Sequence, residues 1–232
     1  MPAHLIDRLL WAAYAFLWLG GVGSHILTGG TPANMAWAAP VFLALAAVIA
    51  VRGEWPHSKP IAIAASIGFV AEAIGVASGY PFGPYRYTPV LAPMLLGVPV
   101  VVIGAWMALF VYVRQMRLGI MLSAALMAAL DLVIDPLAAN FLGYWEWLGG
   151  GPYYGVPLLN FAGWFAVSLL IFLVAPRKTI PNRAALWLGT SILLFFTAIA
   201  AAHAYFLPAT LGVAFSGFGY FRSMRSSVST MI

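Results

Sequence analysis

The sequence predicts an all-α integral membrane protein: a polytopic bundle of about seven transmembrane helices with a cytoplasmic N-terminus. Of the 232 residues, 63% are hydrophobic and only 7% are charged, whereas a soluble domain carries roughly 25% charged residues. The mean hydropathy is +0.96. So few charges cannot cover a surface that faces water, so lipid must cover it instead.

Apolar runs bounded by charge, proline or glycine predict the individual spans. These are residues 6–27, 33–51, 61–79, 91–113, 118–141, 157–175 and 184–206. The first run is too long for the hydrophobic region of a signal peptide, so we expect it to be retained as a helix. No repeat or low-complexity linker divides the chain. Residues 1–206 are therefore expected to form one transmembrane domain, followed by a mobile C-terminal tail over 207–232.

Lysine and arginine predict the orientation. With seven spans, the side that holds the N-terminus also holds Arg8, Arg52, Lys59, Arg114, Arg117, Arg177, Lys178 and Arg183, and the other side holds Arg86, Arg222 and Arg225. Because basic residues collect in cytoplasmic loops, the N-terminus is predicted to be cytoplasmic in a multi-pass protein of the cell membrane. Two loops rich in aromatics, glycine and proline, 80–89 and 142–157, then share the outer face. Aromatic residues at this position normally anchor helices at the membrane interface. The alternative is that these two loops form a functional site at the outer face.

Composition excludes several chemistries. Cysteine is absent, which removes disulfides, thiolate catalysis and iron–sulfur clusters. The histidines are scattered singles, and neither a phosphate-binding loop nor a dinucleotide fingerprint occurs. We therefore expect no cofactor, no bound metal and no nucleic-acid partner.

Three carboxylates lie inside predicted helices: Glu72, Asp131 and Asp135. A charged side chain at a helix centre costs about 2.5–3.5 kcal/mol on insertion scales, so such residues are functional candidates. At 1.5 Å per residue all three fall roughly 10–15 Å below the outer surface. Asp131 and Asp135 are four residues apart and share a helix face, and Pro136 frees a backbone carbonyl one turn earlier. A purely structural role, in which they bond Arg86, a tryptophan N–H or a backbone, is the alternative.

Paired carboxyl groups in a low dielectric suit acid–base chemistry. Desolvation and a like-charged neighbour both raise the pKa of a carboxyl group, so one member keeps its proton as a general acid while its partner acts as base. Aromatic faces nearby stabilise a developing carbocation. The residues thus favour cofactor-free proton addition to an alkene of a lipid. Asp131 and Asp135 also fit the D-x-x-x-D element of magnesium-dependent prenyltransferases, but the second aspartate-rich segment of those enzymes is missing.

Several segments, in order, resemble one family. They are EAIGVASGYPFGPYRY at 72–87, LGVP at 96–99, Trp106, DLVIDP at 131–136, WEW at 145–147 and GPYYGVPLLNFAGW at 151–164. This pattern, covering about residues 68–175, is similar to the carotenoid hydratase family of membrane carotenoid biosynthesis proteins, which includes γ-carotene 1′,2′-hydratases and bisanhydrobacterioruberin hydratases. Ser78 stands where the family usually has threonine.

The resemblance implies a carotenoid 1,2-hydratase, a hydro-lyase. It would add water across the terminal C1=C2 bond of an acyclic carotenoid, related to lycopene, γ-carotene or a bacterioruberin precursor, and give a tertiary 1-hydroxy group without a cofactor. Membrane lipid surrounds such a protein, and association with other carotenoid enzymes is compatible with this role. A different lipid enzyme, such as a prenyltransferase or a lycopene-cyclase-like protein, and a non-catalytic carotenoid-binding protein are the alternatives.

In the mechanism we expect, a protonated aspartate delivers its proton to C2, and water captures the cation at C1. The order of preference for the acid is Asp135, Asp131 and then Glu72, with Glu72 or the second aspartate as base and Asn160 holding the water. The expected substrate-binding residues are Phe82, Tyr85, Arg86, Tyr87, Trp145, Trp147, Tyr153, Tyr154, Asn160 and Trp164.

Overall fold

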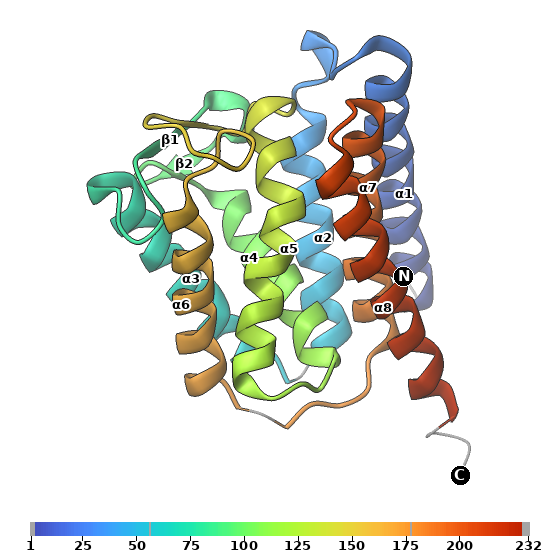
Figure 1. Ribbon diagram of the computed structural model, residues 1–232. Helices are drawn as coiled ribbons and strands as arrows, with labels where there is room; N and C mark the ends of the chain where they lie inside the picture. The colour runs from blue at the N-terminus through green and yellow to red at the C-terminus, as the bar shows by residue number, and fades with distance from the viewer. Residues whose placement is uncertain (1–2, 56, 177, 229–232) are drawn as a thin grey trace.

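The computed structural model describes residues 3–55, 57–176 and 178–228, and eight α-helices make up most of that part of the chain (Figure 1). The helices are α1 (Ala3–Thr28), α2 (Ala38–Glu54), α3 (Lys59–Ser78), α4 (Val100–Gln115), α5 (Ile120–Asn140), α6 (Leu158–Val174), α7 (Arg183–Ala202) and α8 (Phe206–Val228). The short elements are the 3₁₀ turns η1 (Ala33–Met35) and η2 (Pro89–Leu91) and the strands β1 (Tyr85–Tyr87), β2 (Met94–Leu95), β3 (Val98–Pro99) and β4 (Trp145–Trp147).

The predicted fold class, an all-α polytopic membrane protein, is confirmed. Five helical segments are long and apolar enough to cross a membrane: His4–Thr28, Ala33–Glu54, Lys59–Ser78, Ile120–Asn140 and Arg183–Ala202. The apolar helices α4 and α6 are shorter, with 16 and 17 residues. Large side chains such as Leu9, Phe16 and Leu27 are exposed on α1, as expected of a helix whose outer face meets lipid.

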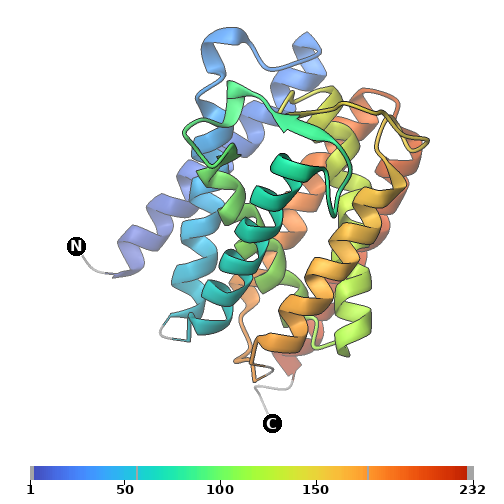
Figure 2. The ribbon, with the colours of Figure 1, turned by 90° about the vertical axis from the view of Figure 1, so that its left-hand side faces the viewer.

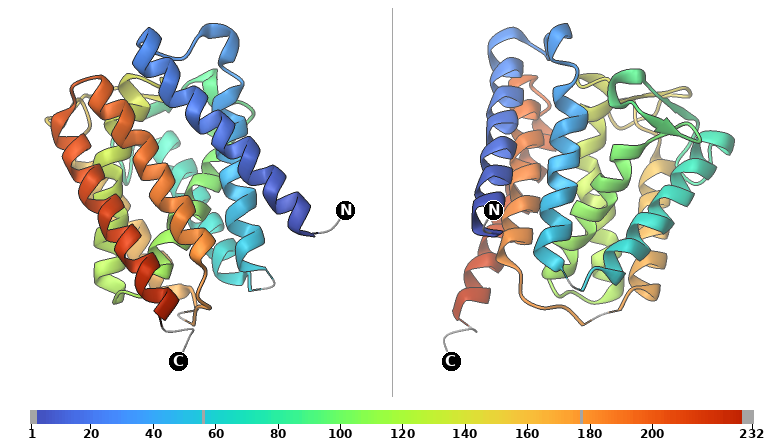
Figure 3. Two further views of the ribbon diagram at one scale, coloured as in Figure 1. Left: turned by 90° about the vertical axis from the view of Figure 1, so that its right-hand side faces the viewer. Right: turned by 180° about the vertical axis from the view of Figure 1, so that it is seen from behind.

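The helices form a bundle in which α3 and α6 lie at one edge and α1 and α8 at the other (Figures 1 and 3). Between them stand α2, α4, α5 and α7. The largest fully buried side chains, including Trp106, Tyr112 and Phe110 on α4 and Met127 on α5, fill the interior. The centre of the bundle is therefore close-packed around α4 and α5.

Helix α8 differs from the sequence expectation, which placed residues 207–232 outside the bundle as a mobile tail. Residues 206–228 form a helix that runs back along α7 (Figure 3), and 229–232 lie outside the described residues. The glycines and serine that suggested mobility instead permit close packing, because Gly212, Ser216 and Gly219 are spaced i, i+4 and i+7 on one helix face. A Cβ at Gly212 would collide with Thr197, and Ser216 is buried.

This eighth helix also changes the distribution of basic residues. Arg222 donates a hydrogen bond to the carbonyl of Met116, so the C-terminal half of α8 reaches the turn between α4 and α5. Arg222 thereby joins Arg114 and Arg117 at one end of the bundle. Of the lysine and arginine side chains that the structure describes, only Arg86 belongs to the other end. The cytoplasmic N-terminus remains a prediction, and the more one-sided distribution favours it.

The fourth helix begins later than predicted. The sequence predicts a span from residue 91, but residues 91–99 form the end of η2 and a small β2–β3 hairpin, and α4 begins at Val100. Proline explains the difference, because Pro93 and Pro99 lack the N–H that a helix interior requires. Leu96 and Gly97 both have positive φ, at 53° and 79°, and form the two-residue turn of the hairpin.

A second pair of strands covers the end of the bundle opposite the α4–α5 turn (Figure 1). Strands β1 and β4 pair antiparallel with Tyr85 opposite Trp147, Arg86 opposite Glu146 and Tyr87 opposite Trp145. We call these two strands the lid. Figure 2 shows β1 lying across the ends of the helices. Because side chains alternate along a strand, the four aromatic residues share one face and the two charged residues the other.

Candidate active site

The inner face of the lid closes a cavity of about 90 Å³ that is lined from α2, α3, α4, α5, α6 and α7. Its polar side holds Glu72 on α3, Asp131 and Asp135 on α5 and Asn160 on α6. These four residues are 5%, 1%, 1% and 2% exposed. The structure therefore brings the three sequence-predicted carboxyl groups and Asn160 into one enclosed site.

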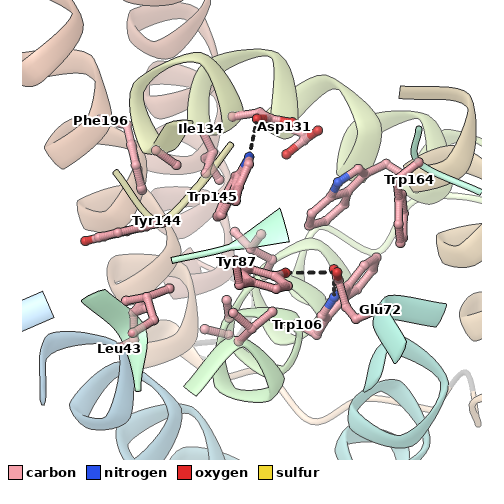
Figure 4. A pocket seen from close by; sticks show the side chains of 18 of the residues that line it. Leu43, Glu72, Tyr87, Trp106, Asp131, Ile134, Tyr144, Trp145, Trp164 and Phe196 are labelled. Atoms are coloured by element: carbon pink, nitrogen blue, oxygen red, sulfur yellow. Dashed lines mark hydrogen bonds between the residues drawn. The ribbon is translucent and has the colours of Figure 1, made fainter. Parts of the chain in front are cut away.

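Three hydrogen-bond donors surround the Glu72 carboxyl group. The hydroxyl of Tyr85 donates to Oε2 at 2.5 Å and that of Tyr87 donates to the same atom at 2.9 Å. The indole of Trp106 donates to Oε1 at 3.1 Å (Figure 4). Burial raises the pKa of both phenols, and the neighbouring carboxylate raises it further, so both hydroxyls remain donors. Three donors to one carboxyl group match its ionised form.

Asp135 also has three donors. The indoles of Trp145 and Trp147 on the lid donate to Oδ1 at 2.8 and 2.9 Å. The amide of Asn160 donates to Oδ2 at 2.6 Å. The lid therefore reaches two acids at once: its tyrosines bind Glu72 and its tryptophans bind Asp135.

Asp131 has fewer donors than the other two acids. The Nδ2 atom of Asn160 donates to Asp131 Oδ2 at 2.5 Å and also to Asp135, so both amide protons of this residue are used. No other donor to Asp131 is found among the described residues. Two buried carboxyl groups thus meet at one amide nitrogen, and Asp131 has the poorer set of partners for a negative charge.

Aromatic rings form the remaining walls of the polar side. Trp106 on α4 stacks on Trp164 on α6 with centroids 4.2 Å apart and planes at 13°. On the lid, Tyr85 contacts Trp147 at 5.2 Å and Tyr87 contacts Trp145 at 5.9 Å. Glycine makes this packing possible, because a Cβ at Gly68 would lie 2.6 Å from the ring of Trp106. Aromatic rings therefore line the cavity around the acids.

The opposite side of the cavity is apolar. Figure 4 shows three apolar or aromatic side chains across the cavity from Glu72 and Trp164. They are Leu43 on α2, Phe196 on α7 and Tyr144, which precedes β4. Further apolar lining residues are Phe42, Ala46, Leu91, Leu109 and Ile192. These residues could not be selected from the sequence, because apolar side chains that line a cavity have the same composition as those that face lipid. The cavity thus has one acidic and one hydrocarbon-like side.

Seven of the ten expected substrate-binding residues line this cavity: Phe82, Tyr85, Tyr87, Trp145, Trp147, Asn160 and Trp164. Arg86 does not, since it lies on the outer face of the lid in an ion pair with Glu146 at 2.6 Å. Tyr154 also lies elsewhere and packs on Tyr205 with centroids 4.4 Å apart. The sequence signal for Arg86 was available, because Tyr-Arg-Tyr and Trp-Glu-Trp both alternate with the period of a strand.

Tyr153 has a different role from the expected one. Pro136 lies inside α5 and lacks the N–H that would bind the carbonyl of Leu132. The hydroxyl of Tyr153 donates to that carbonyl at 2.9 Å. Tyr153 therefore compensates for the proline beside Asp135 and does not line the cavity.

The fold and site together define a polytopic membrane protein with a buried, aromatic-lined cluster of carboxyl groups. This chain belongs to the carotenoid biosynthesis protein family, whose family model matches residues 33–218. A curated relative, bisanhydrobacterioruberin hydratase from Haloarcula japonica, is 32% identical over 117 residues, which cover 44% of this chain and 39% of the relative. The match thus spans well under half of that relative's length. No solved structure matches the chain.

Proposed function

We propose that this protein is a carotenoid hydratase, which adds water across the terminal C1=C2 bond of an acyclic carotenoid. The observation that carries the proposal is the cavity itself, with three buried carboxyl groups on one side and hydrocarbon-like walls on the other. Family membership supports a carotenoid-modifying enzyme, and the hydratase named among the relatives favours this reaction.

The donors around each carboxyl group suggest separate roles. Glu72 and Asp135 each accept three hydrogen bonds, which stabilise a negative charge. Asp131 accepts one, so a proton on this group costs the fewest interactions. We therefore assign the proton-donating role to Asp131, ahead of Asp135, which the sequence alone ranked first.

The reaction then begins with transfer of the Asp131 proton to C2 of the end group. The C1=C2 π electrons form the new C–H bond and leave a tertiary cation at C1. The Glu72 carboxylate and the stacked rings of Trp106 and Trp164 offset that charge. No separate cofactor takes part in these steps.

Water completes the reaction by forming the C1–O bond. The carboxylate of Asp135 accepts the proton that the water loses. Because Asn160 holds both aspartates at one nitrogen, proton transfer within the pair restores Asp131 for the next cycle. In total, one alkene and one water molecule give one tertiary alcohol.

Expression in a lycopene-producing host tests the proposal. We expect each hydrated end to raise the pigment mass by one water. In heavy water, the product should carry one deuterium at C2 that does not exchange. The variant Asp131→Asn should hydrate the pigment at least about 100-fold more slowly. The exposed acid of the lid provides a matched control, and Glu146→Gln should retain conversion.

The rival functions give different products. An isomer with a ring and no mass change would indicate a cyclase, and an added isoprenoid unit that a chelator prevents would indicate a prenyltransferase. Pigment that is bound but unchanged would indicate a binding protein. Any of these outcomes would contradict the hydratase proposal.

A further inference from the structure

A second cavity opens at the end of the bundle away from the lid, between the α4–α5 turn and the segment that joins α6 to α7. Its volume is about 460 Å³. Arg114, Arg117 and Lys178 line it, and none of the described residues that line it is acidic. Neither the cavity nor these side chains has a part in the proposed hydration.

Arg114 leaves one buried donor without a partner. Its side chain is 7% exposed and its Nη1 pairs with Glu54 Oε2 at 3.1 Å. Its Nη2 donates to the carbonyls of Pro176 and Lys178. Its Nε is buried and has no hydrogen-bond partner among the described residues. A buried charged donor without an acceptor is costly. Arg114 also lines the cavity, so a negative charge there would stabilise the guanidinium, although Nε itself has almost no accessible surface for a direct hydrogen bond.

The start of α5 adds further donors to the same cavity. This 21-residue helix begins at Ile120 after an N-cap glycine, Gly119, with no side-chain cap. The first amides of such a helix lack intrahelical acceptors and carry the positive end of the helix dipole. Gly119, Ile120 and Ser123 all line the cavity. A helix start beside cationic side chains is a typical arrangement for binding a phosphate group.

The other walls are apolar. Leu118, Phe172 and Ala175 line the cavity beside the cations. Glu54 already balances the charge of Arg114, whereas Arg117 and Lys178 are exposed and each provides a further positive charge. An anionic head with an apolar body fits these walls better than a free ion, and basic pockets at the cytoplasmic ends of membrane helices bind anionic lipid headgroups.

We propose that this cavity binds the phosphate of an anionic phospholipid, with Arg117 and Lys178 at the headgroup, the first amides of α5 as donors and the buried Arg114 guanidinium adding positive charge behind them. The apolar wall then contacts the glycerol and the first acyl carbons. The site is separate from the carotenoid cavity and does not depend on the function proposed for it.

Titration of the full-length protein in neutral detergent with phosphatidylglycerol, followed by native mass spectrometry, tests this site. We expect phosphatidylglycerol to bind and phosphatidylcholine to bind at least tenfold more weakly, since its choline would face two cations. The double variant Arg117→Gln/Lys178→Gln should lose about 30-fold in affinity, at about 1 kcal/mol per basic residue. The matched control Arg8→Gln/Lys59→Gln removes the same charge from exposed positions and should stay within twofold.

A second variant separates binding from folding. A Cβ at Gly119 would meet no atom within 4 Å, and aspartate is a favoured N-cap residue. Gly119→Asp should therefore raise the melting temperature while its carboxylate competes with the phosphate and weakens lipid binding at least tenfold. Unchanged phosphatidylglycerol affinity in Gly119→Asp or in the double variant would overturn the proposal. Binding of inorganic phosphate as tightly as the lipid would overturn the lipid assignment.

Discussion

Replacing Asp131 by asparagine separates proton donation from folding. Asparagine has the same shape, and its Oδ1 can still accept the hydrogen bond that Asn160 now donates to Asp131 at 2.5 Å. Only the acidic proton is lost. A positioned general acid typically contributes 10²- to 10⁴-fold to a rate. We therefore expect Asp131→Asn to slow hydration at least about 100-fold, with a melting temperature close to that of the parent protein.

Asp135→Asn should behave differently because of its three donors. Its carboxylate accepts from Trp145, Trp147 and Asn160, whereas an amide offers one acceptor oxygen and turns its N–H₂ toward at least one donor. Losing one hydrogen bond to a charged group costs about 1.5–3 kcal/mol. For a chain of this size we expect a fall of about 3–12 °C in melting temperature, together with loss of activity.

Both variants can be measured in the same preparations. Pigment extracts from a lycopene-producing host give the hydration yield, and tryptophan fluorescence of the purified protein gives the melting temperature. Glu146→Gln serves as the control for each. Full hydration by Asp131→Asn would refute the assignment of the acid. Equal melting temperatures for the two variants would refute the reasoning from hydrogen-bond donors.

Three other predictions follow from contacts elsewhere in the bundle. Arg114→Leu should destabilise the protein by about 3–5 kcal/mol in thermal unfolding because Glu54 is left buried without a positively charged partner, and the added substitution Glu54→Leu should recover part of the loss. Gly68→Ala should displace Trp106, remove one donor from Glu72 and lower pigment conversion at least tenfold, as product analysis would show. A chelator should leave conversion unchanged, because protein N–H and O–H donors bind the carboxyl oxygens of the site; loss of activity would contradict the metal-free mechanism.

The sequence predicted which acids meet, because depth in a membrane follows from position along a helix. Glu72, Asp131 and Asp135 were each placed in the outer half of the bilayer by counting residues from a helix end, and the structure has them in one cavity. Counting could not identify which acid lacks donors, because Asn160 and the lid reach the aspartates only through tertiary packing.

The parts that the sequence did not reveal depend on contacts between distant segments. The pairing of Tyr85 with Trp147 joins residues that are far apart in the chain, so the sequence did not show that the two aromatic segments form one lid. Helix α8 was missed for a related reason. Glycines such as Gly212 and Gly219 are typical of a flexible tail. Here they allow α8 to pack closely, because a Cβ at either position would collide with Thr197 or Tyr112.

The lid limits how a substrate can enter the site. Raising β1 and β4 together would break four hydrogen bonds to Glu72 and Asp135, at a cost of about 6–12 kcal/mol. Fewer than about one molecule in 10⁴ would then stand open at any moment. If the substrate is the carotenoid that we propose, we therefore expect it to enter from the surrounding bilayer between two helices, with its end group at the acids and the rest of the molecule among the lipid tails.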